Sequence, residues 1–413
     1  MREMKNSGLP WIGIIPDHWE CIRGKYILKY LSKPVKEDDG VITCFRDGEV
    51  TLRSNRREDG FTMADKEIGY QGIDIGDLVV HGMDGFAGAI GISDSRGKAS
   101  PVLNVLDTQQ NKRYIMYYLR SMAYGDVFIA MATGIRVRSC DLRWNKLANF
   151  EYLVPPIEEQ IKIAEFLDAK CSEIDALITD IQAQIETLEQ YKRSTVIETV
   201  TKGLNSNIAM KDSGVQWIGK IPETWDFIRG KYVLKYITKP TKEDDGVITC
   251  FRDGEVTLRS KRREEGFTMA DKEIGYQGID VGDLVVHGMD GFAGAIGISD
   301  SRGKASPVLN VLETDQNKRY IMYFLRSMAY GDVFLALATG IRVRSCDLRW
   351  NKLAELFYPI PSLEEQAQIV EHIDHVIEET NKIIADKKAQ IATLEAYKKS
   401  IIFEYVTGKK EVE

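Results

Sequence analysis

The chain has 413 residues, 44% of them apolar, and its 55 Lys and Arg against 62 Asp and Glu give a net charge of −7. That length is too great for one core, and the apolar fraction is typical of folded domains. No run of 18 apolar residues exists, which excludes a membrane-spanning helix, and the first residues lack the apolar core of a signal peptide. Without an export signal or a C-x-x-C pair, we expect packed, reduced cysteines and a cytoplasmic location.

An internal repeat dominates the sequence. Residues 1–206 recur, with substitutions, as residues 207–412. Between 38 and 147 only eight of 110 positions differ from their counterparts, namely 55, 59, 75, 107, 109, 118, 129 and 131. The segments 157–205 and 363–411 instead keep their apolar spacing and share few surface residues. The repeat therefore predicts one function performed twice.

Each repeat begins as a mixed α/β region. In the first copy, residues 7–155, short strand-like runs lie between Gly and Asp turns. They are expected at 41–45, 48–52, 77–80 and 89–93. Gly85-Phe86-Ala87-Gly88 separates the last two runs and predicts a hairpin or a bulge. A helical stretch follows from 111 to 132, and Pro155-Pro156 ends the region, since proline is tolerated only in the first turn of a helix.

Two segments with helical periodicity follow the two mixed regions. In both, seam residues recur with alternating spacings of three and four, which is typical of a coiled coil. The first seam is Ala164, Leu167, Cys171, Ile174, Ile178, Ile181, Ile185 and Leu188. The second is Val370, Ile373, Ile377, Thr380, Ile384, Lys387, Ile391 and Leu394, in which Thr380 and Lys387 weaken the apolar face. Each helix is the obvious cover for the other seam, and we expect the two to pair antiparallel.

These patterns divide the chain into four parts, joined in the middle by a linker at 201–212. We expect one mixed domain at 1–155, a helix at 156–205, a second mixed domain at 206–361 and a second helix at 362–413. The predicted fold class is α+β, with two mixed α/β domains separated by two long antiparallel helices and a pseudo-twofold axis relating the halves.

Basic clusters are the main chemical feature of the domains. Arg can hold guanine in the major groove through its planar fork, and it can also neutralise phosphate. A solvated surface, or pairing with nearby Asp and Glu, explains a single Arg equally well. Three clusters that recur almost unchanged in both copies favour a DNA-binding surface. Its candidate residues are Arg53, Arg56, Arg57, Arg96, Lys98, Arg136, Arg138, Arg143, Arg259, Arg262, Arg263, Arg302, Lys304, Arg342, Arg344 and Arg349.

The charge distribution points the same way. Residues 156–200 contain ten acidic and four basic residues, whereas residues 40–147 contain thirteen acidic and fourteen basic ones. A polyanion would therefore bind the domains and avoid the helix.

Other residues carry weaker signals. The segment from Gly82 to Gly88 lacks the spacing of a phosphate-binding loop and is expected to form turns. His81 and His287 follow apolar runs and are expected to be partly buried, while His372 and His375 suit a helix surface better than a metal site. The chain contains no phosphate-binding loop, nucleophile motif, zinc spacing or amino-methyltransferase tetrapeptide. We therefore expect no catalytic residues, no bound metal and no enzymatic activity.

Several motifs resemble those of the DNA specificity subunits of type I restriction–modification systems. The segment from Ser7 to Trp19, repeated from Ser213 to Trp225, looks like the start of a target recognition domain. Pro155-Pro156-Ile157-Glu158-Glu159-Gln160 resembles the entry to that family's helical regions, as does its counterpart at 361–366. The order of domain, helix, domain and helix covers essentially the whole chain.

The resemblance implies a non-catalytic reader of double-stranded DNA. Each recognition domain would read one half of a split target, and the helices would dock two methyltransferase subunits. The resemblance places the cofactor S-adenosylmethionine in that partner, not in this chain, and the partner would methylate adenine N6 after flipping the base. Endonuclease or translocase subunits would be further partners, and no membrane is involved.

The chain departs from this family's usual pattern because its two domains are nearly identical. Identical readers related by a twofold axis see the same half-site on opposite strands. We therefore expect an inverted repeat interrupted by unspecified bases. Two other classes remain open: a coiled-coil scaffold whose globular heads bind protein, and a single-chain nuclease or methyltransferase, which would need a catalytic motif that the sequence lacks.

Overall fold

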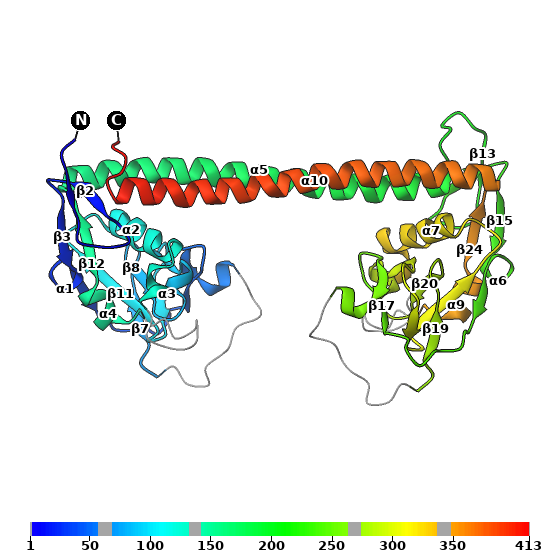
Figure 1. Ribbon diagram of the computed structural model, residues 1–413, viewed down its shortest axis with the longest axis horizontal. Coiled ribbons are helices and arrows are strands. Elements are labelled where there is room, and N and C mark those ends of the chain that lie inside the picture. Colours follow the sequence, from blue (N-terminus) through cyan, green and yellow to red (C-terminus); the bar gives the residue numbers. More distant parts are fainter. Residues whose placement is uncertain (1, 57–67, 132–141, 263–273, 337–347, 413) are drawn as a thin grey trace. The chain divides into compact units, whose positions relative to one another are not determined.

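The structure is a computed structural model that describes residues 2–56, 68–131, 142–262, 274–336 and 348–412 (Figure 1). It forms two compact units. Unit 1 combines Met1–Ile181 with Ala389–Glu413, and unit 2 is Gln182–Lys388. The two units contain corresponding elements in the same order, as the sequence repeat predicts.

The first domain contains twelve strands among its described residues. They are β1 (Met4–Asn6), β2 (Ile14–Pro16), β3 (Glu20–Arg23), β4 (Leu28–Leu31), β5 (Ile42–Cys44), β6 (Val50–Leu52), β7 (Gln71–Ile73), β8 (Leu78–His81), β9 (Ile90–Ile92), β10 (Gly97–Ala99), β11 (Leu103–Thr108) and β12 (Glu151–Val154). Its helices are α1 (Gly24–Ile27), α2 (Lys112–Tyr124), α3 (Val127–Ala130) and α4 (Trp144–Asn149), with 3₁₀ turns η1 (Arg53–Asn55) and η2 (Gly85–Ala87).

The second domain repeats this list. Its strands are β13 (Met210–Asp212), β14 (Lys220–Pro222), β15 (Asp226–Arg229), β16 (Lys235–Ile237), β17 (Ile248–Cys250), β18 (Val256–Leu258), β19 (Gln277–Ile279), β20 (Leu284–His287), β21 (Ile296–Ile298), β22 (Gly303–Ala305), β23 (Leu309–Glu313) and β24 (Phe357–Ile360). Its helices are α6 (Gly230–Val233), α7 (Lys318–Tyr330), α8 (Val333–Ala336) and α9 (Trp350–Glu355), with 3₁₀ turns η4 (Arg259–Lys261) and η5 (Gly291–Ala293).

The strands expected from the sequence are confirmed, and the long helical stretch is interrupted. The runs at 41–45 and 48–52 form the hairpin β5–β6, and β8 pairs with β9 across the Gly85–Gly88 turn. The stretch from 111 to 132 instead forms two helices, because Gly125 ends α2 and Asp126 takes a left-handed φ of 55° before α3. That conformation is uncommon for a residue with a side chain, and it turns the chain between the two helices.

A four-stranded antiparallel sheet of order β4-β11-β8-β9 is the centre of the first domain. Successive side chains of a strand point to opposite faces. Leu78 and Val80 of β8 accordingly join a core with α2, while Val79 between them joins a second core beneath β5, β6, β7 and β10. The sheet β16-β23-β20-β21 of the second domain has the same two cores.

Two long helices follow the domains, α5 (Ile157–Lys202) and α10 (Leu363–Val406). In unit 1 the beginning of α5 packs on the end of α10, where the rings of Phe166 and Tyr405 lie 4.4 Å apart. Lys398 Nζ lies 2.6 Å from an Asp175 carboxylate oxygen further along the pair. As the residue numbers rise along α5, the numbers of the residues that they contact in α10 fall. The pairing within this unit is therefore antiparallel, as predicted.

Unit 2 contains the converse pairing, between the end of α5 and the beginning of α10. Lys387 Nζ contacts Gln184 Oε1 at 2.5 Å, and Lys192 Nζ contacts Asn381 Oδ1 at 2.8 Å. Thr380, expected to weaken the seam, is 4% exposed, whereas Lys387 keeps its ammonium group at the surface by bonding to Gln184. The α+β fold class is confirmed in each unit by the sheet, the short helices and the antiparallel helical segments.

The domain of each unit forms hydrogen bonds with both long helices. In unit 1, Trp19 Nε1 donates to Glu159 Oε2 at 3.0 Å, and the buried Tyr114 hydroxyl lies 3.1 Å from Leu153 O and from Val406 O. In unit 2, Trp225 Nε1 donates to Glu365 Oε1 at 3.0 Å, and Tyr320 repeats the role of Tyr114. The motifs that carried the family resemblance therefore meet at the junctions between domain and helix.

None of the helices in the described part of the chain is long and apolar enough to cross a membrane.

Candidate nucleic-acid interface

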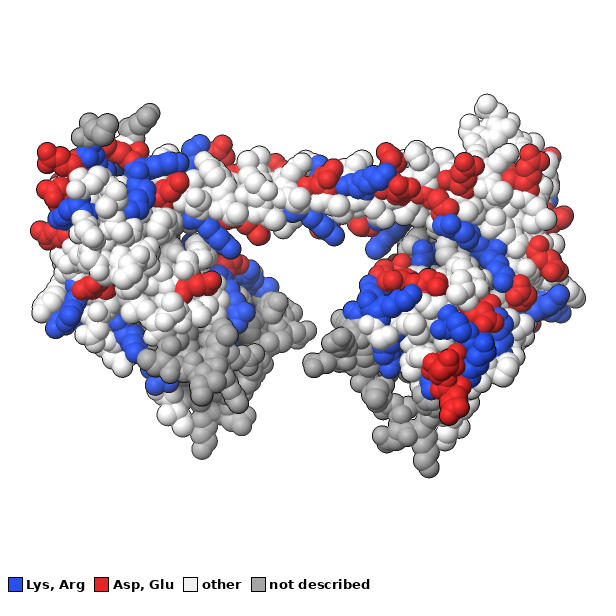
Figure 2. Space-filling model, in the orientation of Figure 1, with Lys and Arg blue, Asp and Glu red and all other residues white. Residues whose placement is uncertain are grey.

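Ten of the sixteen candidate DNA-binding residues lie within the described structure. Six lie outside it, namely Arg57, Arg136, Arg138, Arg263, Arg342 and Arg344. Figure 2 shows that Lys and Arg side chains on the described surface of both domains lie among Asp and Glu side chains. The surroundings of each basic residue therefore matter more than its presence in a cluster.

Arg96 forms part of an internal ion-pair network. Its guanidinium group bonds Asp39 through two nitrogens, at 2.9 and 2.7 Å, and Asp74 through a third at 2.6 Å. The Asp39 side chain is only 4% exposed. Hydrogen bonding from Arg96 lowers the pKa of Asp39 to about 2, despite burial, which acts in the opposite direction.

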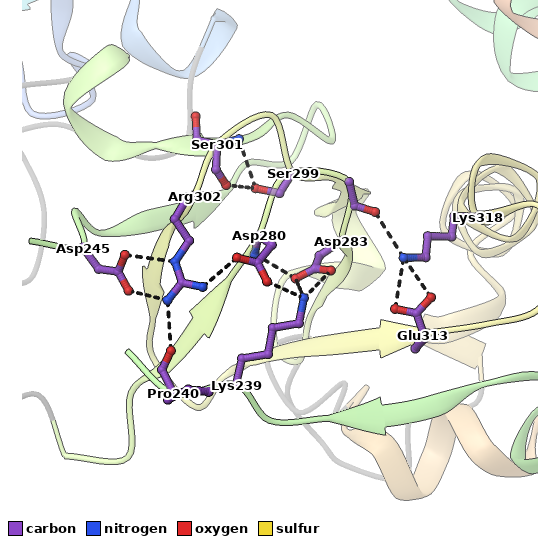
Figure 3. A network of polar contacts seen from close by, with 11 residues as sticks. Lys239, Pro240, Asp245, Asp280, Asp283, Ser299, Ser301, Arg302, Glu313 and Lys318 are labelled. Carbon is purple, nitrogen blue, oxygen red and sulfur yellow. Dashed lines mark hydrogen bonds and ion pairs between the residues drawn. The ribbon is translucent and has the colours of Figure 1, made fainter. Parts of the chain in front are cut away.

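Lys33 extends the same network. Its ammonium group bonds Asp74 at 2.7 Å and the buried Asp77 at 2.6 Å. Unit 2 repeats the whole arrangement around Arg302, in which Asp245, Asp280 and Asp283 are the acidic partners and Lys239 is the second cation (Figure 3). The network fixes the turn before β8 or β20 to the preceding loop, and this geometry favours a structural role for Arg96 and Arg302.

Arg56 and Arg262 also face acidic partners. The Arg56 guanidinium group bonds Asp47 in a bidentate manner, lies 3.0 Å from Glu49 and stacks 4.3 Å from the centre of the Phe45 ring. Arg262 repeats these contacts with Asp253, Glu255 and Phe251. Unlike Arg96, both side chains remain more than a third exposed. Their outer faces can still meet a phosphate, so the DNA contact stays a prediction.

The remaining described candidates lie in a 3₁₀ turn, in a strand and directly before a short helix. Arg53 begins η1, where its Nε donates to Thr43 Oγ1 at 3.3 Å, and Lys98 lies in β10, which pairs with β7. Arg143 directly precedes α4. Arg259, Lys304 and Arg349 hold the same positions in unit 2. Each also takes part in further interactions, so none is a free cation.

The backbone before Arg143 is firmly anchored. Leu142 N donates to Gly82 O at 2.7 Å, and Asn104 Nδ2 donates to Leu142 O at 3.0 Å. Since Asn104 is buried in β11, the central sheet itself positions Arg143. Asn310 and Leu348 repeat this bond before Arg349.

The Gly82–Gly88 segment forms turns, as expected. His81 accepts hydrogen bonds at Nδ1 from Met83 N and Asp84 N, at 3.2 and 2.9 Å. Its side chain is mostly buried, and this burial lowers its pKa despite the nearby Asp84 carboxylate. His287 behaves in the same way. Each of these histidines therefore stabilises a turn as a neutral imidazole.

Cysteines and the histidines of α10 give no sign of chemistry within the described residues. Burial raises the pKa of Cys44 and of Cys250 to about 12, which favours the unreactive thiol. Cys21 is exposed, however, so the expectation that all cysteines are packed is wrong at this position. His372 and His375 lie on the surface of α10, and no group of three potential metal ligands occurs among the described residues.

Position 55 is the one difference between the copies inside the basic clusters. Asn55 lies in η1, and its Nδ2 donates to Thr51 Oγ1 of the preceding strand β6 at 2.9 Å. Lys261 instead reaches Ser301 Oγ at 2.7 Å and Asp300 at 3.5 Å, in the turn before β22. The extra charge of unit 2 is therefore partly neutralised by its own domain.

A cavity lies between the domain and the helices in each unit, with a volume of about 580 Å³ in unit 1 and 680 Å³ in unit 2. Arg46, Tyr124 and Lys398 line the first, together with Asp47 and other acidic residues. Side chains of both charge signs line the cavity in each unit.

Sequence reasoning missed the acidic partners of the arginines. Asp39 and Asp74 lie far from Arg96 in the sequence, and they meet it only because β7, β10 and the loop before β5 pack together. A run of Asp and Glu on both sides of a turn was the only available signal, and it does not specify a partner.

Comparisons with known proteins complete the description. No protein-family model matches the chain. It is 27% identical over 235 residues to the MjaX type I restriction enzyme specificity subunit of Methanocaldococcus jannaschii, an alignment covering 52% of this chain and 53% of that protein. It is 24% identical over 420 residues to the MjaVIII specificity subunit of the same organism, covering 96% of this chain and 94% of that protein. The chain thus spans about half of the first relative and nearly all of the second.

Solved structures resemble the chain over most of its length. One chain from a study of complex assembly and conformational transition of the type I restriction–modification system has a TM-score of 0.65 at 14% identity, covering 96% of this chain and 99% of that one. The HsdS subunit from Thermoanaerobacter tengcongensis has a TM-score of 0.50 at 15% identity, covering 96% and 98%. The fold is therefore shared with these proteins.

Proposed function

We propose that this chain, which is similar in sequence and fold to the specificity subunits of type I restriction–modification systems, selects the DNA target of such a system. The observation that carries the proposal is the sequence similarity to the MjaVIII specificity subunit, which covers 96% of this chain, including both of its domains and both of its long helices, and 94% of that protein. A scaffold with unrelated heads would share the helical periodicity alone. The role is recognition, and catalysis belongs to the partners.

The target proposed for this chain is an inverted repeat with a spacer of unspecified bases. Two features support it. The described surfaces of the two domains are nearly the same, including the networks around Arg96 and Arg302. In addition, each domain packs on the beginning of the helix that follows it and on the end of the other helix, so the two units are equivalent by exchange of α5 and α10. Two equivalent domains on an antiparallel pair of helices would read the same bases on opposite strands of the DNA.

The proposed partners are two methyltransferase subunits on the helices, with endonuclease or translocase subunits as possible additions to the complex. Residues 156–200 carry an excess of six negative charges, which suits docking of protein better than contact with DNA. S-adenosylmethionine would bind the methyltransferase, which would flip an adenine and methylate its N6. This chain would supply only the position on the DNA.

Arg53 and the candidates at 136 and 138 are the proposed base-reading or phosphate-binding group of the first domain, together with Arg259, Arg342 and Arg344 in the second. A base-reading Arg contributes about 1–3 kcal/mol at one base pair, whereas a phosphate contact acts on all sequences and on the salt dependence of binding. Arg53 and Arg259 each begin a 3₁₀ turn that directly follows a strand, β6 or β18.

The test is DNA retention by the complex of this chain with its methyltransferase. The wild-type complex should bind duplex DNA with an affinity that falls as salt rises. Replacing Arg53, Arg136 and Arg138 and their three counterparts by alanine should weaken binding at least tenfold. A matched control replaces Arg113 and Arg319, which bond Asp168 and Asp374 of the helices, and should leave binding unchanged. Salt-independent retention, or full binding by the six-alanine variant, would refute the assignment and favour a protein-binding scaffold.

A further inference from the structure

A cluster of lysines and aromatic rings lies on α1, β4 and α4, where α4 begins directly after the candidate residue Arg143. Lys25 and Tyr26 lie in α1, and Lys29 and Tyr30 in β4. Trp144 and Lys146 lie in α4, beside α1 at one side of the domain (Figure 1). We call these six residues the lysine–aromatic patch.

Packing brings the parts of the patch together. A Cβ on Gly24, at the start of α1, would lie 2.1 Å from Leu147 O, so only glycine allows α1 to approach α4 this closely. The rings of Tyr30 and Trp144 lie 5.9 Å apart. α1 and β4 follow one another directly in the chain, whereas α4 comes much later, so the fold joins two distant stretches of the sequence into one surface.

The patch is exposed and positively charged. Tyr26 is 73% exposed, and all three lysines are exposed. Among the residues that the structure describes, none forms an ion pair with Lys25, Lys29 or Lys146; Lys25 contacts only the Tyr26 ring, at 4.9 Å from its centre. Asp107 lies opposite Lys29 in the strand register but is held by Lys112 at 2.9 Å. The three ammonium groups are therefore available to a ligand.

The chemistry of the patch fits the sugar–phosphate backbone of DNA better than a protein. Tyr and Trp are enriched in protein–protein interfaces, but Lys, which supplies all the charge of the patch, is depleted there. Lys and Tyr are both common donors to phosphate oxygens. The patch also continues into Arg143, because Trp144 follows that residue at the start of α4. A duplex held at Arg143 would extend along the lysines. We propose that the lysine–aromatic patch binds the phosphate backbone of duplex DNA next to the bases that each domain reads, an assignment that rests on the proposed function.

The second domain holds the same six side chains in a more acidic setting. They are Lys231, Tyr232, Lys235, Tyr236, Trp350 and Lys352. Asp315, where the first copy has Gln109, lies 3.8 Å from Lys235. Glu355, where the first copy has Asn149, lies 3.5 Å from the neighbouring Arg229. Unit 1 has one acid here that unit 2 lacks, because Glu151, opposite Arg23 in the strand register, is replaced by Phe357. Unit 2 therefore carries one more negative charge near the patch, and the patch of unit 1 should bind phosphate more strongly.

The experiment measures the salt dependence of duplex binding by the complex with the methyltransferase. One variant carries Lys25→Gln, Lys29→Gln and Lys146→Gln, and a second carries Lys231→Gln, Lys235→Gln and Lys352→Gln. Each phosphate contact contributes about 0.9 to the slope of log K against log salt. We expect the slope to fall by about 2–3 for the first variant and by less for the second, with the methylated sequence unchanged. Replacing the same three lysines of unit 1 by arginine should preserve the slope.

Two further variants sharpen the result. Asp315→Gln with Glu355→Asn removes the acidic neighbours of the second patch and should steepen the slope. Lys5→Gln, Lys202→Gln and Lys220→Gln remove three exposed lysines from elsewhere and should leave it unchanged.

The outcomes separate this inference from the proposed function. A wild-type complex without salt-dependent DNA binding would overturn both. A wild-type complex that binds, with lysine variants of unchanged slope, would overturn only the patch. Loss of methyltransferase co-purification by the lysine variants, at an unchanged DNA slope, would show that the patch docks protein and would also overturn the inference.

Discussion

The domains and the long helices of this chain have the same duplicated origin and differ in how closely their copies agree. The helices keep most of the buried seam positions, such as Leu167 in α5 and its counterpart Ile373 in α10, while their surface residues differ. The domains keep exposed residues as well, including Tyr26 and Tyr232. Packing alone demands only the apolar pattern, as the helices show. Identity on the exposed domain surfaces therefore supports the proposal that both domains bind the same ligand.

The largest effect is expected where the identical residues stabilise the domain itself. Arg96→Ala should lower the free energy of unfolding by about 3 kcal/mol, because it leaves the buried Asp39 carboxylate without its partner. Arg302→Ala should do the same through Asp245. Urea-induced unfolding measures both. Arg56→Ala, which breaks a more exposed pair, is the control and should cost less than about 1 kcal/mol. Equal effects of Arg96→Ala and Arg56→Ala would contradict the structural role.

The same network gives the domains a common response to acid. Arg96 lowers the pKa of Asp39 to about 2, below the value of about 3.9 for an unfolded Asp. Stability from this carboxylate is therefore complete above about pH 4 and is lost as the pH falls toward 2. The midpoint of unfolding should decrease as the pH is lowered through this window, and measurements between pH 5 and 2 would show it. Asp39→Asn should make the midpoint depend less on pH. An unaltered pH profile in that variant would show that Asp39 does not contribute.

The junctions between domain and helix should respond alike in the two units. Tyr114→Phe removes the hydroxyl that contacts Leu153 O and Val406 O, and Tyr320→Phe removes its counterpart. Each change leaves buried carbonyl groups with fewer donors and should cost about 1–2 kcal/mol. Thermal unfolding of the two variants is the measurement. A loss in one unit without a loss in the other would show that the junctions are not equivalent.

A substitution in the seam between the long helices should have a smaller effect, and it should raise the stability. Thr380 is buried between helices whose other seam residues are mostly apolar. Thr380→Val should raise the free energy of unfolding by about 1 kcal/mol, because it replaces a buried hydroxyl by a methyl group. Val370→Thr, at another buried seam position, should have the reverse effect. Destabilisation by Thr380→Val in urea would show that the hydroxyl is required.

The smallest effect is expected at position 55 and its counterpart. Lys261→Asn removes the contacts with Ser301 and Asp300 and makes the clusters of the two domains identical. Because the Lys261 side chain is half exposed, stability should change by less than about 0.5 kcal/mol. Target selection by the complex should also remain the same, as shown by competition with DNA of altered half-sites. A change in the preferred bases would mean that Lys261 reads DNA.

Local patterns in the sequence predicted most of the fold. The proline pair before Ile157 marked the start of α5, and the three–four spacing identified its buried face. Gly125 and Asp126 did not reveal the break between α2 and α3, because the left-handed φ of Asp126 depends on tertiary packing. The pairing of β3 with β12, from opposite ends of the domain, was likewise invisible to local periodicity.

The candidate interface was less predictable than the fold. Repeated arginines indicated a surface but could not separate Arg96, which bonds Asp39 and Asp74, from Arg56, whose side chain is more than a third exposed. Charge counts ignore which acid each arginine meets. The lysine–aromatic patch was missed for a related reason, since Lys146 is far in the sequence from Lys25 and Lys29 and none of the three lies in an Arg cluster.

Mapping of methylated adenines in DNA modified by the complex tests the central claim most directly. Two equal recognition domains should place the modified bases in an inverted repeat, with the same half-site on each strand and a spacer of any sequence between them. Two unrelated half-sites flanking the spacer would contradict the account.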